Sequence, residues 1–381
     1  MLDKFSLKKF YLTSSRTALH IFIYFVLTSC GFQKKDTIAI TLDKSKAIDS
    51  FSISKLNSSE RELSHLSFLN DSTLISFDNF DNLCIYTKKD NQFSYYRPVA
   101  LQPFSDSPRF FYLDTIRKRS YTFRDRTIYT YNSSFSLIDS MTLNLSVGGL
   151  KTNYFLSATS FLPFIKKEYS FICNFSHSDV NDFFKTYNEP ALIEFSLTDT
   201  SIPNAKTYFK KPAQLKYYDV SFLSSHVNID NAIYKLYSGF DTLYSYQLNT
   251  GKENKTAIHN KDYVLPEKSD LKRLFDYGYR TKHTLASFSY SGMFYNPASK
   301  NLMLFYKTPV VESADKNPTS KDQKLKAILL NSAFKVISYI EFKDSYYNEA
   351  HFFIYKNKGI AMPIENEDPL HEKTTFYIYN F

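Results

Sequence analysis

The sequence predicts an all-β protein, a six-bladed β-propeller closed by an N-terminal strand, and three observations lead to this fold class. Tyrosine and phenylalanine alternate with polar residues in many short segments, which is typical of β-strands. A strand–turn–strand unit recurs along the chain, and such recurrence indicates a repeat architecture. The final unit lacks one strand, which an alternating segment near the N-terminus can supply. A two-domain β-sandwich protein is the alternative fold.

The first 29 residues have the features of a secretory signal peptide. Basic residues precede an apolar stretch at 18–27, which is shorter than the roughly 20 residues needed to cross a bilayer. The stretch ends in Leu27-Thr28-Ser29-Cys30, which resembles the bacterial lipobox. This resemblance implies that Cys30 carries the lipid and becomes the first residue of the mature chain. Several acyl chains on one residue form a stable anchor, because each buried methylene contributes about 0.8 kcal/mol. The alternative is a plain signal peptide with an accidental cysteine.

Residues 30–42 are expected to form a lipidated tether, and residues 43–381 the folded domain. The polar segment 33–36, with sequence QKKD, weakly resembles the charged export tags of surface lipoproteins in Bacteroidota. A solvated polar linker explains the same residues without any export role. Both a periplasmic and a surface-facing orientation are compatible with this segment.

Charge and cysteine content restrict the function classes. The whole chain has a formal net charge of +9, of which the signal region supplies four basic residues and one acidic residue, so about +6 remains for the mature chain. No basic block is dense enough to indicate nucleic-acid binding. Cys84 and Cys173 lie in apolar segments and are expected to be buried thiols, with a disulfide as the alternative. No cysteine or histidine spacing matches a metal site, and no cofactor is expected.

The strands are predicted where aromatic and β-branched residues alternate with polar ones between Asn, Asp, Ser and Lys turns. Clear examples are 72–78, 126–132, 242–248 and 375–380. Helical periodicity is confined to two short pieces, one expected after a cap at Ser178 and the other after a cap at Ser269. The sequence therefore predicts a chain that is nearly all β.

Two kinds of hairpin alternate along the chain. The first kind occurs at 82–99, 128–143, 191–202, 242–258 and 326–342, and its first half recurs at 374–381. The second kind, with an aromatic pair before its turn, occurs at 111–123, 294–306 and 352–364. Together they give about six units of four strands, the composition of propeller blades. We expect residues 46–54 to pair with 374–381, because this pairing completes the last unit and removes two open edges.

Three segments gather residues of the types that bind metals or catalyse reactions, and each has a simpler explanation. His177, Asp179 and Asp182 are close in sequence, but acids are favoured in the first turn of any helix by its dipole. The acids and histidine of 365–372, namely Glu365, Glu367, Asp368, His371 and Glu372, fit a charged hairpin loop. Segment 76–82 offers oxygen ligands but lacks EF-hand spacing, and turn chemistry accounts for it.

Motifs for nucleophilic catalysis, phosphate binding and dinucleotide binding are not found in the sequence. No pair of carboxylates stands out that would support glycoside hydrolysis. We therefore assign no catalytic, metal or ligand-binding residue from the sequence and expect the protein not to be an enzyme. Cys30 is the single site residue, for lipidation.

The lipobox at Cys30, the chain length and the six-fold repetition together resemble the lipid-anchored, TolB-like six-bladed propellers of Bacteroidota, over residues 36–381. The resemblance implies an outer-membrane lipoprotein whose propeller binds or scaffolds a glycan, a peptide or an envelope protein. The alternative is a propeller enzyme acting on envelope or dietary glycans. Acids and histidines converging on a deep axial pocket favour the enzyme, whereas scattered polar or apolar groups favour the binding protein.

Overall fold

Strands dominate the fold because large apolar residues alternate with polar ones. In β2 (Asp49–Ser54), Phe51 and Ile53 are buried and the alternating serines at 50, 52 and 54 are more exposed, as the pleat of a strand dictates. Residues in β26 (Lys373–Tyr379) alternate in a similar way over most of its length. The prediction of an all-β fold is confirmed.

A computed structural model describes residues 37–381 apart from internal gaps. The gaps are 55–63, 78–82, 100, 102–110, 115, 125–126, 143–153, 158–164, 168–169, 178–189, 197–205, 219–223, 274–275, 311–318, 320–321, 345–350 and 365–372. The signal peptide, Cys30 and the helix expected after Ser178 lie outside the described residues. Residues 39–381 form one compact unit, which argues against the two-domain alternative.

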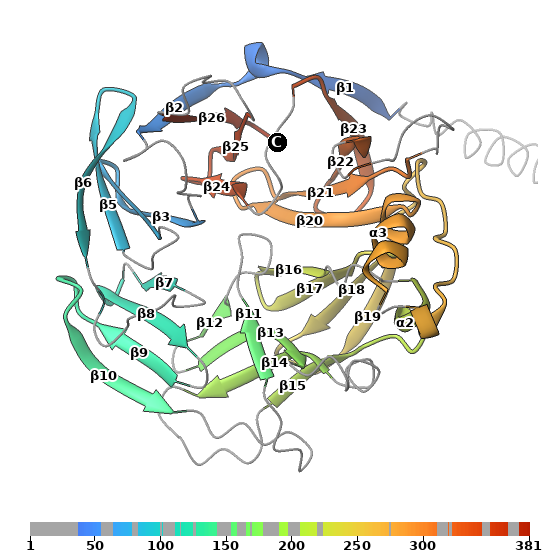
Figure 1. Ribbon diagram of the computed structural model, residues 1–381, viewed down its shortest axis with the longest axis horizontal. Helices are drawn as coiled ribbons and strands as arrows, with labels where there is room; N and C mark the ends of the chain where they lie inside the picture. Colours follow the sequence, from blue (N-terminus) through green and yellow to red (C-terminus); the bar gives the residue numbers. More distant parts are fainter. Residues whose placement is uncertain are drawn as a thin grey trace, which may run out of the picture. The chain divides into compact units, whose positions relative to one another are not determined.

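In the described residues the strands form five sheets, and division of the eight-stranded sheet in two gives six antiparallel groups, numbered here in chain order (Figure 1). Group 1 consists of β3 (Ser64–Asn70), β4 (Thr73–Phe77), β5 (Leu83–Lys89) and β6 (Gln92–Val99). Group 2 consists of β7 (Phe111–Asp114), β8 (Arg119–Arg124), β9 (Thr127–Tyr131) and β10 (Leu137–Thr142). Group 3 consists of β11 (Tyr154–Ser157), β13 (Ser170–His177), β14 (Pro190–Ser196) and β15 (Lys206–Lys210), with β12 (Ile165–Lys166) beside β13.

The other three groups follow the same order of neighbouring strands. Group 4 consists of β16 (Ser224–Ile229), β17 (Ala232–Tyr237), β18 (Thr242–Gln247) and β19 (Glu253–Ala257). Group 5 consists of β20 (Ser289–Asn296), β21 (Asn301–Lys307), β22 (Leu325–Leu330) and β23 (Val336–Phe342). Group 6 consists of β24 (Phe353–Tyr355), β25 (Gly359–Pro363), β26 and β2. The predicted hairpins are therefore halves of these groups, except that the second half of 191–202 lies outside the described residues and β14 pairs instead with the later strand β15.

The N-terminal segment completes group 6. β2 pairs antiparallel with β26, from Asp49 opposite Ile378 to Ser54 opposite Lys373. This confirms the predicted pairing of 46–54 with 374–381. β2 also pairs in parallel with β6 over two residue pairs, so groups 1 and 6 belong to one eight-stranded sheet.

A strand that the sequence analysis did not anticipate precedes β2. β1 (Ile38–Leu42) lies beside β23 as a fifth strand of group 5. Ile40 and Leu42 pack against the apolar cluster between groups 5 and 6, which explains why this short segment is held as a strand. The expected tether of 30–42 therefore overlaps the folded part of the chain by the five residues of β1.

Each group packs against the next through large apolar side chains, and group 6 packs against group 1. Phe135 of group 2 joins Ile75 and Leu83 of group 1 in one cluster. The remaining contacts are represented by Tyr121–Phe171 (groups 2 and 3), Tyr208–Tyr246 (3 and 4), Tyr234–Phe334 (4 and 5), Phe305–Phe352, the residue before β24 (5 and 6), and Phe68–Tyr355 (1 and 6), with ring centroids 4.7–5.2 Å apart. Aromatic residues thus share the core between neighbouring groups with leucine, isoleucine and methionine.

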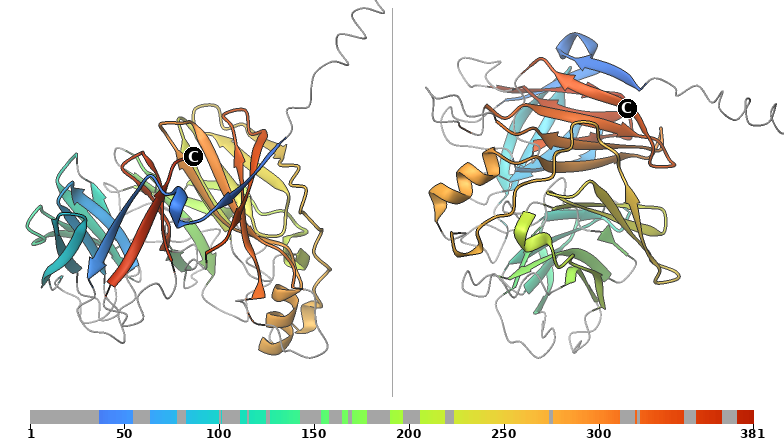
Figure 2. Two further views of the ribbon diagram at one scale, coloured as in Figure 1. Left: turned by 90° about the horizontal axis from the view of Figure 1, so that it is seen from above. Right: turned by 90° about the vertical axis from the view of Figure 1, so that its right-hand side faces the viewer.

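The helix expected after Ser269 begins later than predicted. Residues Leu271–Arg273 form only a 3-10 turn, and α3 (Tyr277–Leu285) starts after Asp276, whose carboxylate accepts a hydrogen bond from the Tyr279 amide at 3.1 Å. Ser269 instead donates its hydroxyl to the Tyr217 carbonyl at 3.1 Å. Figure 2 shows α3 at one face of the sheets, away from β1. Among the described helices, none is long and apolar enough to cross a membrane.

Candidate functional site

Most of the residues that the sequence analysis considered for chemistry lie outside the described residues. This applies to Cys30, Asp179 and Asp182, to segment 365–372 and to most of segment 76–82. His177 is the last residue of β13. Within the described part of the chain, no group of three or more His, Cys, Asp or Glu residues is placed to hold a metal ion.

The two cysteines after Cys30 are buried thiols. Cys84 on β5 and Cys173 on β13 belong to different strand groups, and no disulfide joins them. Burial raises the pKa of the Cys173 thiol well above its usual range, and a thiol kept protonated is a poor nucleophile. The expectation of buried thiols is confirmed, and the disulfide alternative is wrong.

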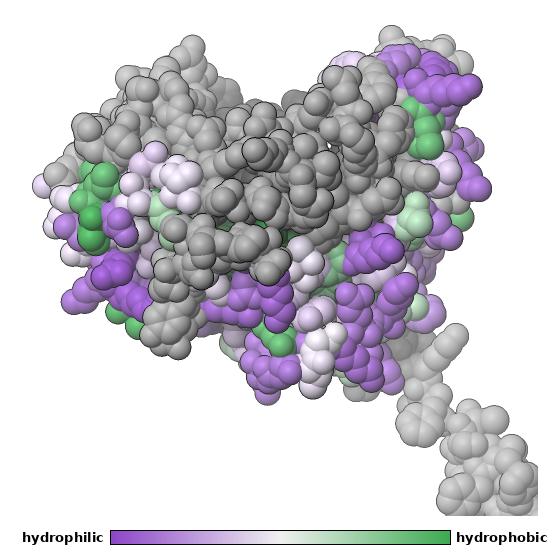
Figure 3. All heavy atoms as spheres, turned by 90° about the horizontal axis from the view of Figure 1, so that it is seen from below, coloured by the Kyte–Doolittle hydropathy of each residue, from purple (hydrophilic) through white to green (hydrophobic). Residues whose placement is uncertain are grey.

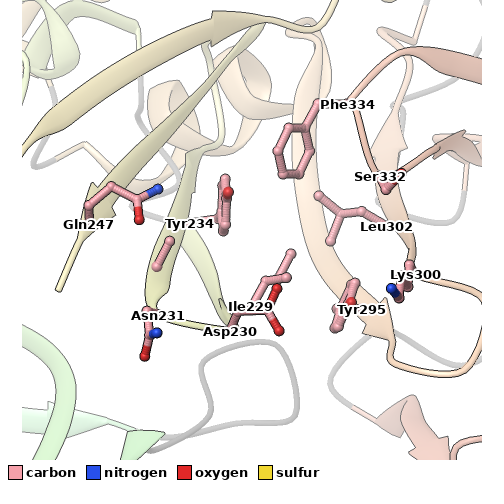
Figure 4. A pocket seen from close by; sticks show the side chains of 11 residues that line it. Ile229, Asp230, Asn231, Tyr234, Gln247, Tyr295, Lys300, Leu302, Ser332 and Phe334 are labelled. Atoms are coloured by element: carbon pink, nitrogen blue, oxygen red, sulfur yellow. The ribbon is translucent and has the colours of Figure 1, made fainter. Parts of the chain in front are cut away.

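A pocket of about 260 Å³ opens between groups 4 and 5 (Figure 4). Three hairpin turns supply most of its lining: the β16–β17 turn, the β20–β21 turn and the β22–β23 turn. Tyr234 on β17, Gln247 on β18, Tyr295 on β20 and Leu302 on β21 complete it. The pocket is therefore built where two neighbouring groups bring their turns to the same edge.

The turns have their shape because three non-glycine residues accept a left-handed backbone. Asp230, Lys300 and Phe334 have φ values of 52°, 58° and 57°. Asp230 and Asn231 form a two-residue hairpin loop, since Ile229 pairs directly with Ala232, and such loops require positive φ. Aspartate and asparagine tolerate this conformation better than most residues, so the loop can carry polar side chains to the pocket.

The β22–β23 turn is held by a side chain from its own first residue. The Asn331 amide oxygen accepts hydrogen bonds from the Ala333 and Lys335 amides, each at 3.0 Å. This arrangement leaves Phe334 in the left-handed region and turns its ring onto Tyr234, with the centroids 4.7 Å apart. Together with buried Leu302, the two rings form the apolar side of the pocket (Figure 4).

The polar side of the pocket combines one acid, one base and two amides. Asp230, Asn231 and Lys300 are exposed, and Gln247 is half-buried. Among the described lining residues, Asp230 carries the negative charge and Lys300 the positive charge, so the lining is neutral overall. Both hydrogen-bond donors and acceptors are thus available without a net electrostatic preference for an anion or a cation.

The two tyrosines of the pocket remain protonated at neutral pH. Burial, followed by the negative charge of Asp230 and the nearby Tyr295, raises the pKa of Tyr234. Burial and the charge of Asp230 also raise the pKa of Tyr295. Each hydroxyl therefore stays a hydrogen-bond donor and acceptor, and neither is activated as a nucleophile or base.

Other buried polar groups fasten loops and sheets. Asp262 accepts hydrogen bonds from the Tyr306 hydroxyl at 2.7 Å and from the Lys326 ammonium at 3.0 Å, which holds the segment after β19 on group 5. Fully buried Lys235 donates to Asn174 at 3.1 Å and to Ser224 at 2.8 Å, and so connects group 4 to group 3. These contacts explain the polar residues by folding alone.

Exposed apolar side chains are scattered. Ile116 is 93% exposed and Tyr277 is 74% exposed, but they belong to different elements. On the face shown in Figure 3, the coloured residues are mostly hydrophilic, with hydrophobic residues in small separate spots. The described part of that face therefore presents no broad apolar docking surface.

The pocket residues were not singled out by the sequence. Asp230, Lys300 and Phe334 come from three hairpins far apart in the chain. The available local signal was the Asp-Asn pair between two alternating segments, which indicates a tight hairpin. That signal says nothing of which other turn lies beside it.

Comparison with known proteins bears on the fold of the chain. No protein-family model matches the chain, and no curated protein matches it. Among solved structures the chain is similar to a member of the DUF4221 family from Bacteroides vulgatus, with a TM-score of 0.66 and 13% identity over 87% of this chain and 96% of that chain. It is also similar to the WD40 repeats of RRP9, with a TM-score of 0.44 and 7% identity over 87% of this chain and 97% of that chain. Together with the successive antiparallel strand groups, the first likeness supports a propeller-like fold shared with the Bacteroides protein.

Proposed function

We propose that the chain is an outer-membrane lipoprotein, anchored through Cys30, whose folded part is a six-bladed propeller that binds a ligand. The pocket between groups 4 and 5 carries the binding part of this proposal. It combines an apolar side formed by Tyr234, Leu302 and Phe334 with exposed polar groups, which is the usual composition of a ligand site.

The six strand groups are the blades in this proposal. Each contains a run of four strands, to which β12 is added in group 3 and β1 in group 5, and its side chains contact the next group along the chain. The pairing of β2 with β26 supports closure of the ring, because it joins the two ends of the folded chain within one blade. A closed ring leaves no long unpaired edge between its first and last blades.

Binding fits the pocket better than catalysis. Hydrolysis of a glycosidic bond requires two carboxyl groups flanking the scissile bond, and Asp230 is the single carboxyl group among the described lining residues. The raised pKa values of Tyr234 and Tyr295 leave both hydroxyls protonated. A binding role predicts that a bound glycan or peptide is recovered unchanged, and release of a cleaved product would contradict it.

The anchor is tested by Cys30→Ala. Without the thiol no acyl chain can be attached, so the variant should move from the membrane fraction to the soluble periplasmic fraction. Cell fractionation in high salt, with the wild-type chain and a Cys84→Ala variant as controls, measures this change. Pelleting of Cys30→Ala with the membranes to the wild-type extent would show that Cys30 is not the anchor.

A further inference from the structure

We propose that the pocket between groups 4 and 5 binds one ring of a neutral saccharide. This inference rests on the proposed binding function and adds the chemical class of the ligand. Four features of the pocket support it: its size, the distribution of apolar and polar groups in its lining, its charge and the strands that flank it.

The pocket has the size of a single ring. Its volume of about 260 Å³ lies just below the range of about 300–1,000 Å³ that accommodates drug-sized ligands. A longer ligand would have to leave most of its length outside the pocket. A single sugar unit, free or at the end of a chain, is therefore the matching size.

The lining has two kinds of surface, as a sugar ring does. A pyranose has C–H groups on its face and hydroxyls around its edge. The rings of Tyr234 and Phe334, with Leu302, offer an apolar wall for the face. Asp230 and Lys300 lie where hydroxyls at the edge can meet an acceptor and a donor (Figure 4).

The charge of the lining favours an uncharged ligand. The carboxylate of Asp230 and the ammonium of Lys300 cancel, and Asn231 and Gln247 are neutral. An acidic sugar or an amino sugar would meet one like charge and one opposite charge, so its own charge would gain no net attraction while it lost part of its hydration. Hydroxyl groups interact with both charges as donors or acceptors, and hydrogen bonds to charged groups are the stronger kind.

The flanking strands argue against an extended peptide in this pocket. Peptides commonly bind by adding a strand to a free sheet edge. β17 and β21, which carry Tyr234 and Leu302, are hydrogen-bonded on both sides. The polar groups that face the pocket come from side chains on turns, which suits a ligand recognised through its hydroxyls.

The chain itself provides a matched control for the test. Asp90 and Asn91 form a two-residue hairpin loop between β5 and β6, and Asp90 has a φ of 55°. Asp230 and Asn231 form the same loop between β16 and β17. Asp90 does not line the pocket, so Asp90→Asn reproduces the chemical change of Asp230→Asn away from the site. Asparagine accepts the left-handed backbone in both places.

The experiment measures saturation transfer by NMR from the full-length chain, in a detergent without sugar groups, to glucose, galactose, mannose and N-acetylglucosamine. We expect transfer to the ring C–H protons of at least one of them. Asp230→Asn should weaken that binding about tenfold, because it replaces a charged acceptor by a neutral one. Tyr295→Ala should weaken it by a similar factor, because it removes a hydroxyl and a ring from the pocket lining. Asp90→Asn should bind as the wild type does, and thermal unfolding confirms that the variants fold.

Several outcomes would overturn the proposal. The first is absence of saturation transfer to every neutral sugar. The second is equal transfer in the wild type, in Asp230→Asn and in Tyr295→Ala. The third is tighter binding of glucuronate or glucosamine than of the neutral sugars. Should Tyr295→Ala fail to fold, Tyr295→Phe keeps the ring and should still weaken binding. Binding of a neutral tripeptide in the pocket, without binding of any sugar, would contradict the saccharide proposal but not the proposed binding function. Failure of the anchor is seen separately in the fractionation of Cys30→Ala.

Discussion

At the scale of single residues, the left-handed positions in the turns of this protein are mostly occupied by residues other than glycine. The chain has eight glycines, and many hairpin turns place Asp, Asn, Lys or Phe at positive φ instead. Asn132 and Asn331 show how this is achieved, because each accepts hydrogen bonds from two backbone amides of its own turn. Phe135 and Phe334 then take the left-handed position and pack onto the preceding group. Their burial offsets the strain, which is about 1–2 kcal/mol per residue.

The Asp262 carboxylate should make the protein less stable in acid. Burial raises the pKa of this carboxyl, but the hydrogen bonds from Tyr306 and Lys326 and the charge of Lys326 outweigh it, and the folded-state pKa lies below the ordinary value of 3.8. A lowered folded-state pKa contributes stability above pH 4, and this contribution is lost as the pH falls through the folded-state value.

We therefore expect Asp262→Asn to lower the free energy of unfolding by about 1–2 kcal/mol at pH 7. At pH 3, below the ordinary pKa of 3.8, the carboxyl of the unfolded wild type is mostly protonated, so part of this contribution is lost and the wild type and Asp262→Asn should differ less. Urea unfolding at both pH values measures the two differences, with Asp139→Asn on exposed β10 as the control. An equal loss at pH 3 and pH 7 would show that the charge of Asp262 is not what matters.

At the scale of elements, β2 places one buried aromatic side chain among three other strands. Phe51 stacks on Phe376 with ring centroids 5.1 Å apart and touches Phe93 and Phe68 at 5.5 Å and 6.0 Å. Its partners come from β26, β6 and β3. One side chain on β2 therefore joins both ends of the folded chain.

Phe51→Ala should destabilise the protein by about 3–5 kcal/mol, the usual cost of removing a buried phenylalanine. The loss is expected at the high end because the rings around Phe51 come from different strands and cannot easily close the cavity. Ser50→Ala, at the next position of β2, should change the free energy of unfolding by less than about 0.5 kcal/mol. Chemical denaturation measures both variants, and similar small effects of the two would mean that β2 is not part of the core.

For the whole molecule, the N-terminal segment fastens two neighbouring groups. β1 extends group 5 and β2 completes group 6. The link between them is held as well, because the Lys343 amide donates to the Leu42 carbonyl at 3.0 Å and the Lys44 amide donates to Asp344 at 2.8 Å. The segment that follows the expected tether is thus part of the folded structure.

Deleting residues 43–55 should lower the melting temperature by roughly 10 °C, since the buried side chains of β2 are lost. The unpaired edge of β26 should also promote association. Deleting residues 32–36, within the expected tether, should leave the melting temperature nearly unchanged. Differential scanning calorimetry and light scattering compare the two deletions, and equal melting temperatures would contradict a structural role for β2.

The sequence by itself predicted the strands and the partner of β2. Alternation of apolar and polar residues along a strand indicates directly which face is buried. The last repeat unit ended on its third strand and lacked a fourth, and residues 46–54 had the alternation of such a strand. The helix after Ser269 was placed too early, because Asp276 competes for the same role as a cap and only the packed structure selects it. β1 was missed, since five residues carry too little pattern until groups 5 and 6 provide a surface for Ile40 and Leu42.

The sequence alone determined that this chain is built from repeated aromatic hairpins, because strand alternation and turn chemistry are local properties. Only the tertiary structure decided which turns meet. Asp230, Lys300 and Phe334 belong to separate hairpins and share a pocket because group 4 packs against group 5. Contacts between distant segments depend on how sheets stack, and no local pattern encodes that arrangement. The pocket, and with it the class of ligand that we propose, could therefore be identified only from the folded structure.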